Sequence, residues 1–264
     1  MNDDDKSPVA ADPWRRLRHL TTARIGLGRA GVSHTTADVL QLSLAHARAQ
    51  DAVHEALNPV TLCRDLAAAG FDSLTVSSQA ADRAMYLSRP DLGRLLSDES
   101  AALLQCNHAI EHQPERLTVV VADGLSARAV QEQAVSLLQA LRALLDNSWS
   151  CGPVVVACQA RVALGDEVAV RVNASMVLVM IGERPGLSSP DSMGLYLTYG
   201  PFSGIADSRR NCISNVRPAG LSIDAAAARL TWLLQAARAA RTTGVSLKDR
   251  SDQQMLLNRS DRLP

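Results

Sequence analysis

Hydrophobic residues in the second half of the chain alternate between short β-branched runs and longer repeats at helical spacing. Residues 117–122 (LTVVVA) form the first run, which is typical of a strand buried on both faces. After the turn signal Asp123-Gly124, apolar residues recur at helical spacing through residues 127–145. A strand, a tight turn and an amphipathic helix are the first parts of a βαβ unit.

The same kind of run recurs further along the chain. Residues 153–158 and 175–181 predict a second and a third strand, and residues 195–199 are a candidate fourth. Near the end, Ser222 is placed to cap a long helix that stops near Gly244. Strands that alternate with helices favour an α/β fold, which we expect to be a Rossmann-like parallel sheet with flanking helices.

The first half has a more mixed pattern, and we expect a smaller, mostly helical N-terminal region there. Thr35 and Asp38 resemble a capping box that opens a helix, and Asn58-Pro59 predicts that this helix ends near Leu57. The chain divides accordingly into four predicted parts. They are a polar disordered lead (1–13), a mostly helical region (14–115), a Rossmann-like domain (116–247) and a polar tail (248–264).

Composition and charge narrow the function classes. Lys and Arg number 27 and Asp and Glu also 27, so no overall field draws the chain to nucleic acid or to anionic lipid. The five cysteines form no C-x-x-C pair, which predicts neither a disulfide framework nor a zinc site and favours a reducing cytoplasm. The acidic start lacks the apolar segment of a secretory signal, and no apolar run approaches the roughly 20 residues of a membrane helix.

Two segments are expected beyond the carboxyl ends of strands, where α/β sheets bind ligands. Residues 182–186 (GERPG) follow the third strand, and their glycines let the backbone approach a ligand while Pro185 stiffens the loop. The same pattern also fits a solvated turn with an exposed Glu–Arg pair. Residues 212–215 (CISN) follow the fourth strand, although a lone cysteine such as Cys212 is most often an inert core residue.

Templates for self-contained catalysis are missing from the sequence. No G-x-G-x-x-G follows a strand, and the phosphate-binding pattern G-x-x-x-x-G-K-[ST] is absent. Histidines, cysteines and carboxylates do not cluster at the spacing of metal ligands. A chain without its own catalytic set is more typical of an accessory subunit than of a complete enzyme.

Five segments, taken in order, resemble the ethanolamine ammonia-lyase small (light) subunit family. The likeness extends from about Trp14 to Lys248. The segments are residues 24–31 (RIGLGRAG), 86–94 (YLSRPDLGR), 122–126 (ADGLS), 182–186 (GERPG) and 210–215 (RNCISN).

The resemblance implies an enzyme of large and small subunits that converts ethanolamine to acetaldehyde and ammonia by radical chemistry. Its cofactor is adenosylcobalamin, which supplies the radical when its cobalt–carbon bond breaks. In the family the large subunit binds ethanolamine, and the cofactor lies between the subunits with its own base on cobalt. In other cobalamin proteins a histidine that lies two residues after an Asp and three before a Gly replaces this base. None of the six histidines here has that spacing, which agrees with the base-on mode.

The resemblance also implies three cofactor contacts on this chain, with no catalytic residue and no metal ligand. Val162 would pack on the corrin side of the subunit interface, and Cys212 would pack against the ligand or present its backbone. Glu183 would accept charge-assisted hydrogen bonds from amide or hydroxyl groups of the cofactor. Residues 116–247 would then be the cobalamin-contacting domain.

Two departures from the family change what we expect. Family members often carry a longer N-terminal extension that directs them into a bacterial microcompartment, whereas a short acidic lead precedes Trp14 here, so we expect the cytoplasm. Residues 157–160 (ACQA) stand where an aromatic residue and a glycine are more usual in the family, which affects how the cofactor would lie near Val162.

Two other functions stay open: a stand-alone cobalamin-binding or carrier protein without lyase activity, and a generic Rossmann-like nucleotide binder.

Overall fold

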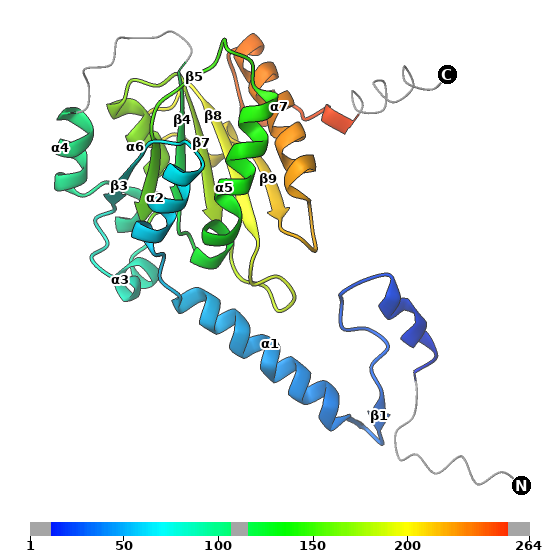
Figure 1. The fold of residues 1–264 in the computed structure, drawn as a ribbon. Helices are drawn as coiled ribbons and strands as arrows, with labels where there is room; N and C mark the ends of the chain where they lie inside the picture. The colour runs from blue at the N-terminus through cyan, green and yellow to red at the C-terminus, as the bar shows by residue number, and fades with distance from the viewer. Residues whose placement is uncertain (1–11, 107–115, 253–264) are drawn as a thin grey trace, which may run out of the picture.

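The computed structural model describes residues 12–106 and 116–252 and shows a mixed α/β protein. Within these residues one seven-stranded sheet has the order β3-β6-β4-β7-β8-β9, and β5 (Ser150–Cys151) pairs with the start of β4. Helices cover both faces of the sheet (Figure 1). Residues 1–11 of the predicted lead, and the tail from residue 253 on, lie outside the described residues, whereas Asp12 and Pro13 cap and begin the first short helix.

Five described strands of the sheet run parallel, β5 and four longer ones. The longer ones are β3 (Ser73–Ser77), β6 (Val154–Cys158), β4 (Arg116–Ala122) and β7 (Met176–Gly182). The last three confirm the predicted strands to within about one residue at each end. Every residue of β4 and β7 is buried, as their unbroken apolar sequences indicate. β3 comes from the region that we expected to be mostly helical, and it pairs with β6.

The sheet is not wholly parallel, which corrects part of the predicted fold. β8 (Met193–Tyr199) runs antiparallel to β7, and β9 (Asn211–Val216) runs antiparallel to β8. The physical reason is the connection between β7 and β8, residues 183–192, which is too short for the crossover that a parallel neighbour requires. The Rossmann-like description of the sheet stays a prediction.

The helices form two layers, each packed on one hydrophobic cluster. α2 (Pro59–Ala68), α5 (Ala127–Leu144) and α7 (Ile223–Ala240) cover one face, and α5 and α7 lie side by side there (Figure 1). α4 (Asp98–Cys106) and α6 (Leu164–Arg171) pack on the other face. Short helices complete the connections: α3 (Arg83–Ser88), η2 (Leu92–Arg94), η3 (Asp207–Arg209) and η4 (Gly244–Ser246).

Capping residues set the helix boundaries largely as predicted. Thr35 Oγ1 accepts from Asp38 N at 3.2 Å and opens α1 (Thr36–His54), and Ser222 Oγ accepts from Ala225 N at 3.3 Å and opens α7. The predicted end of α1 near Leu57 is slightly late. The reason is that Asn58 caps the next helix, α2, instead of ending α1.

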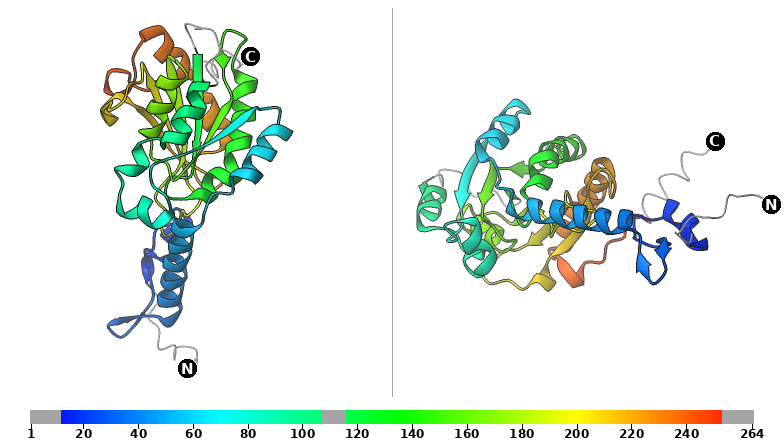
Figure 2. Two further views of the ribbon diagram at one scale, coloured as in Figure 1. Left: turned by 90° about the vertical axis from the view of Figure 1, so that its left-hand side faces the viewer. Right: turned by 90° about the horizontal axis from the view of Figure 1, so that it is seen from below.

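The chain before the sheet stands away from it. η1 (Pro13–His19), the hairpin of β1 (Arg29–Ala30) and β2 (Ser33–His34), and most of α1 project from the body (Figures 1 and 2). Among the helices of the described ranges, none combines the length and the apolar character needed to span a bilayer.

Candidate functional site

A buried carboxylate joins the carboxyl ends of β4 and β6. Asp123 follows β4, and its side chain accepts from Gln159 N at 2.7 Å and from Ala160 N at 2.9 Å just beyond β6. Burial raises the pKa of Asp123, while its hydrogen bonds from backbone amides lower it. These bonds fix the turn that leads to Val162. Sequence reasoning used Asp123 only as a turn signal and missed this role.

Val162 lies at this turn, half-buried and packed against the hydrophobic cluster beneath α6. The residue before it is held in place, because Arg161 N donates to Gly93 O at 2.7 Å and its guanidinium lies 4.3 Å from the centre of the Tyr86 ring. Two buried polar atoms near Val162, Gln159 Oε1 and Arg161 Nε, have no hydrogen-bond partner within the described residues. Both atoms can form a hydrogen bond with a water molecule or with a ligand.

The segments ADGLS and GERPG, which come from distant parts of the sequence, contact each other. Leu125 N donates to Gly182 O at 3.0 Å. A Cβ on Gly124, which has a φ of +57°, would overlap Gly182 O, and a Cβ on Gly182 would overlap Ser126 O. Glycine is therefore required at both positions for the loop after β7 to pack against the start of α5.

Hydrogen bonds from α5 and β9 hold the loop of residues 183–192. Three side chains, from the cap of α5, from α5 itself and from the end of β9, donate to carbonyl oxygens of the loop. They are Ser126 Oγ to Pro190 O at 2.6 Å, Gln133 Nε2 to Asp191 O at 2.7 Å and Arg217 Nη1 to Ser188 O at 2.9 Å. The loop is thus a defined structure whose first residue is Glu183.

Glu183 is half-buried, and its carboxylate links the end of β7 to β9. Its backbone N donates to Ser192 O at 2.9 Å, which closes the loop. Oε2 accepts from Ser192 Oγ and, at 3.2 Å, from Asn215 N. Arg184 is exposed. Instead of forming a solvated turn, the carboxylate is held by its own loop and by a neighbouring strand.

Cys212 lies inside strand β9, which corrects our expectation of a strand-end loop. The polar residues of the segment concealed an edge strand in which only Ile213 and Val216 are buried. Cys212 is exposed, and its Sγ lies 3.3 Å from Ser214 Oγ. It pairs across the sheet with Tyr196 of β8.

Tyr196 is the residue of this group that sequence reasoning missed. It packs on the α6 side of the sheet, whereas Leu195 and Leu197 pack on the other side, so their alternation is the signal that was available. Burial raises the pKa of the Tyr196 phenol well above its usual range, and the nearby Cys212 and Glu183 raise it further. The phenol is therefore a hydrogen-bond donor at neutral pH.

Glu183, Tyr196 and Cys212 come together on the side of the sheet on which α6 packs, next to the antiparallel strands β8 and β9. Gly194 lies between them, where a Cβ would be 3.1 Å from Glu183 Oε1 and 3.1 Å from the Tyr196 ring. Val162 packs on the same hydrophobic cluster as Tyr196, but from the far side of β4 and β7. The structure thus places two of the three predicted contacts next to Tyr196 and the third on the same face.

A buried ion pair fixes the start of β9 to α6. Arg210 donates to both carboxylate oxygens of Asp166, at 2.7 Å each, and the side chains are 2% and 1% exposed. It also donates to Thr198 Oγ1 at 3.0 Å. This bidentate contact sets the position of the strand that carries Cys212.

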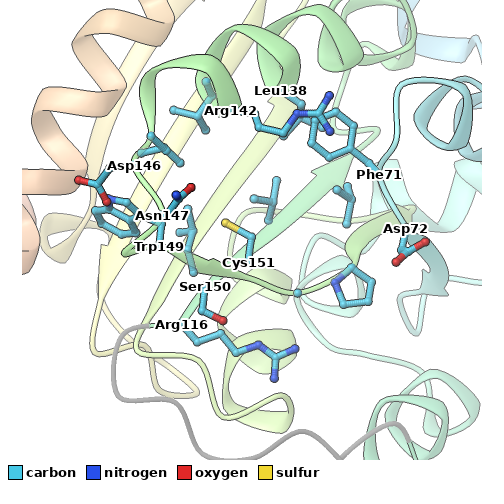
Figure 3. A pocket seen from close by; sticks show the side chains of 17 residues that line it. Phe71, Asp72, Arg116, Leu138, Arg142, Asp146, Asn147, Trp149, Ser150 and Cys151 are labelled. Carbon is cyan, nitrogen blue, oxygen red and sulfur yellow. The ribbon is translucent and has the colours of Figure 1, made fainter.

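A hollow of about 710 Å³ opens at the opposite, amino-terminal end of the strands (Figure 3). Arg116, Trp149 and Cys151 are among its lining residues. Arg142 stacks 4.1 Å from the centre of the Phe71 ring and donates to backbone carbonyls of the loop after α2. No residue of the five segments named above lines this hollow, so we place the functional site at the carboxyl ends instead.

The residues at the carboxyl ends can bind an amide-rich ligand. They offer a carboxylate acceptor, a protonated phenol and a thiol on one side of the sheet. Among the described residues, no three His, Cys, Asp or Glu side chains converge as a metal site.

Comparison with known proteins identifies the chain. A family model described as ethanolamine ammonia-lyase light chain matches residues 11–248. The ethanolamine ammonia-lyase small subunit of Xanthomonas campestris pv. campestris (strain B100) is 52% identical, over 93% of this chain and 90% of the relative. That of Azotobacter vinelandii (strain DJ / ATCC BAA-1303) is 49% identical, over 94% and 92%, respectively.

These matches define the class of protein: the chain is an α/β subunit of a lyase. The chain belongs to the ethanolamine ammonia-lyase light-chain family. The resemblance found in five segments of the sequence is confirmed, and a small subunit implies a large subunit as its partner.

Proposed function

We propose that this chain forms one wall of a cofactor site whose other wall belongs to the large subunit, in an enzyme that converts ethanolamine to acetaldehyde and ammonia. The observation that carries the proposal is the grouping of Glu183, Tyr196 and Cys212 on one side of the sheet, where Cys212 is exposed and the other two residues are half-buried. Polar groups fixed on a rigid element and open on one side suit a ligand that a second subunit covers.

The cofactor of the proposal is adenosylcobalamin with its own base on cobalt. The residues present fit such a group, because a flat ring with peripheral amides needs a level surface and both donors and acceptors. Gly194 keeps the surface level, and Gln159 Oε1 and Arg161 Nε are a free acceptor and a free donor within the described residues. When bound, the cofactor supplies the radical chemistry of the deamination.

The residues of this chain bind and orient the cofactor. Glu183, already oriented by Asn215 N, accepts from a cofactor amide or hydroxyl group. Tyr196 donates from the same face, and Val162 and Cys212 pack against the ligand and exclude water. Ethanolamine binds to the large subunit, and this chain contributes no catalytic acid or base.

The fold supports the same proposal. The connections after β4 and β6 lead to helices on opposite faces, α5 and α6, which is the switch point at which Rossmann-like sheets bind ligands. We therefore keep residues 116–247 as the cobalamin-contacting domain of a Rossmann-like fold. The cytoplasm is the proposed location, with a bacterial microcompartment as the alternative that fractionation of native cells distinguishes.

Substitution of Glu183 tests the cofactor contact. In the complex reconstituted with the large subunit, Glu183→Ala should weaken adenosylcobalamin binding by roughly 1–3 kcal/mol, the cost of a lost hydrogen bond to a charged group. Glu183→Gln keeps an acceptor for Asn215 N and should lose less. The measurement is a spectroscopic titration of the complex with cofactor.

Glu132, an exposed glutamate on α5, provides the control. Glu132→Ala should bind cofactor as the unsubstituted chain does, and thermal unfolding should show that each variant is folded. Unchanged affinity in Glu183→Ala would remove Glu183 from the site.

Activity of the separate subunits tests the division of labour. The isolated chain with adenosylcobalamin should release no acetaldehyde from ethanolamine, and turnover should begin when the large subunit is added. Tight cofactor binding by the isolated chain, without any turnover after the large subunit is added, would favour the stand-alone carrier instead.

A further inference from the structure

The segment Asp12–His54, which we call the arm, has a defined structure although it projects from the body. Asp12 Oδ1 accepts from Trp14 N at 2.8 Å at the start of η1. Gly26, with a φ of +59°, packs so closely on η1 that a Cβ would lie 2.8 Å from Arg15 Cα. The glycines of the RIGLGRAG segment therefore build the arm rather than a phosphate-binding loop.

The arm exposes large apolar side chains. Trp14 is 66% exposed, Val32 at the hairpin tip 98%, and Leu40 and Leu44 of α1 are 64% and 51% exposed. Leu40 and Leu44 are one turn apart and form a stripe on α1. Helices in proteins gain most of their stability from packing of an apolar face, and exposed apolar side chains at neighbouring positions of a helix are typical of an interaction surface.

Charge argues against a second arm as the occupant of this surface. Residues 12–54 contain six arginines and three aspartates and no lysine or glutamate, which gives a net charge of +3. Two arms lying together would place like charges side by side. The fitting partner has an apolar groove with an acidic rim.

The root of the arm lies at the same end of the sheet as the candidate site. Arg83 donates to Val53 O near the end of α1 at 2.7 Å and to Gly124 O after β4 at 2.8 Å. Arg24 Nη2 of the arm donates to Leu187 O at 3.5 Å. Leu187 belongs to the loop that begins at Glu183. A protein that covers the cofactor face therefore meets the arm as well (Figures 1 and 2).

We propose that the arm is a clasp that holds the large subunit, with Trp14, Leu40 and Leu44 buried in an apolar groove of that subunit. This inference rests on the proposed pairing of the two subunits. The arm lies within the residues that the family model matches, which begin at residue 11. Because the clasp is separate from the cofactor contacts, it holds the subunits together without cofactor.

The test measures assembly of the full chain with the large subunit in the absence of cofactor, by sedimentation velocity. The double substitution Leu40→Glu with Leu44→Glu keeps good helix formers and should weaken assembly at least tenfold. Leu144→Glu with Val170→Glu is the matched control, because both residues are 49% exposed on helices of the body. The control should assemble as the unsubstituted chain does, and both variants should keep the thermal unfolding midpoint of the isolated chain.

Assembly of the Leu40→Glu, Leu44→Glu chain with unchanged affinity would overturn the clasp and leave the proposed cofactor site intact. Self-association of the isolated unsubstituted chain that this pair of substitutions abolishes would instead assign the surface to a second copy. Failure of the unsubstituted subunits to assemble would overturn the proposed function together with the clasp.

Discussion

Two of the three tyrosines, Tyr86 and Tyr196, have a raised pKa. Burial raises the pKa of Tyr86 to about 12, although Arg161 opposes the shift, and burial also raises the pKa of Tyr196. In an absorbance titration we expect neither phenol to ionise appreciably below pH 11 in the folded chain. An unfolded tyrosine loses its proton near pH 10, so the stability that these groups contribute falls as the pH rises above about 10.

The variant Tyr196→Phe isolates one of these groups. It should leave the folded titration up to pH 11 unchanged and remove about one third of the amplitude of the unfolded chain, which has three tyrosines. Circular dichroism at each pH checks that the chain stays folded. A folded phenol that titrates near pH 10 and is lost in Tyr196→Phe would contradict the buried position of Tyr196.

At the scale of residues, sequence alone identified the loop of Glu183 but not its partners. The glycines of GERPG and the position after an apolar run were visible in the sequence. The contacts of Glu183 with Ser192 and Asn215 were not, because they depend on which strand lies beside β7. The role of Asp123 was hidden for the same reason, since its partners belong to β6.

Elements with a buried apolar pattern were predicted well, and those at the sheet edges were not. β4, β6 and β7 are covered on both faces, so their sequences are continuous apolar runs. β9 is an edge strand in which three of the six residues are exposed, and its segment suggested a loop. The direction of β8 was also wrong in the prediction, because direction depends on the connection rather than on the strand itself.

The close packing of the two glycine segments predicts a large effect of a small substitution. Gly124→Ala places a Cβ against Gly182 O at a positive φ, so it should destabilise the chain by at least about 3 kcal/mol. Gly200 has a φ of +61° with no atom within 4 Å of the added Cβ, and Gly200→Ala should cost only about 1–2 kcal/mol. Urea unfolding measures both losses of stability. Equal losses would show that the loop after β7 can move away from the added Cβ at little cost.

The molecule as a whole depends on the contact between α6 and the antiparallel edge of the sheet. Arg210→Leu leaves the Asp166 carboxylate buried without its partner, so it should destabilise the chain by about 3–5 kcal/mol. Adding Asp166→Leu to this variant should restore part of the loss, because the unpaired charge is then gone. The measurement is denaturant unfolding of the two single variants and the double variant.

The exposed pair of Arg89 and Asp91 is the control for this cycle. Its side chains are 59% and 55% exposed, and Arg89→Leu should leave the stability of the chain nearly unchanged. An equally small change in stability for Arg210→Leu would mean that the buried ion pair does not stabilise the contact between α6 and β9.

The predicted domain boundary near residue 115 stays a prediction, but one pair of strands joins the two sides of it. β3 precedes the boundary and yet pairs with β6, which no local pattern in the sequence could indicate. The arm was likewise hidden, because the spacing of apolar residues in α1 predicts a packed helix and does not say which molecule it packs against.

The pairing of β3 with β6 also sets an order of events during translation. Residues 73–77 leave the ribosome long before residues 154–158, so β3 has no neighbour to pair with until much of the second half has been made. Non-local pairing of this kind is slow and leaves strand edges exposed while it waits. The nascent chain therefore displays its arm before the body behind it has closed.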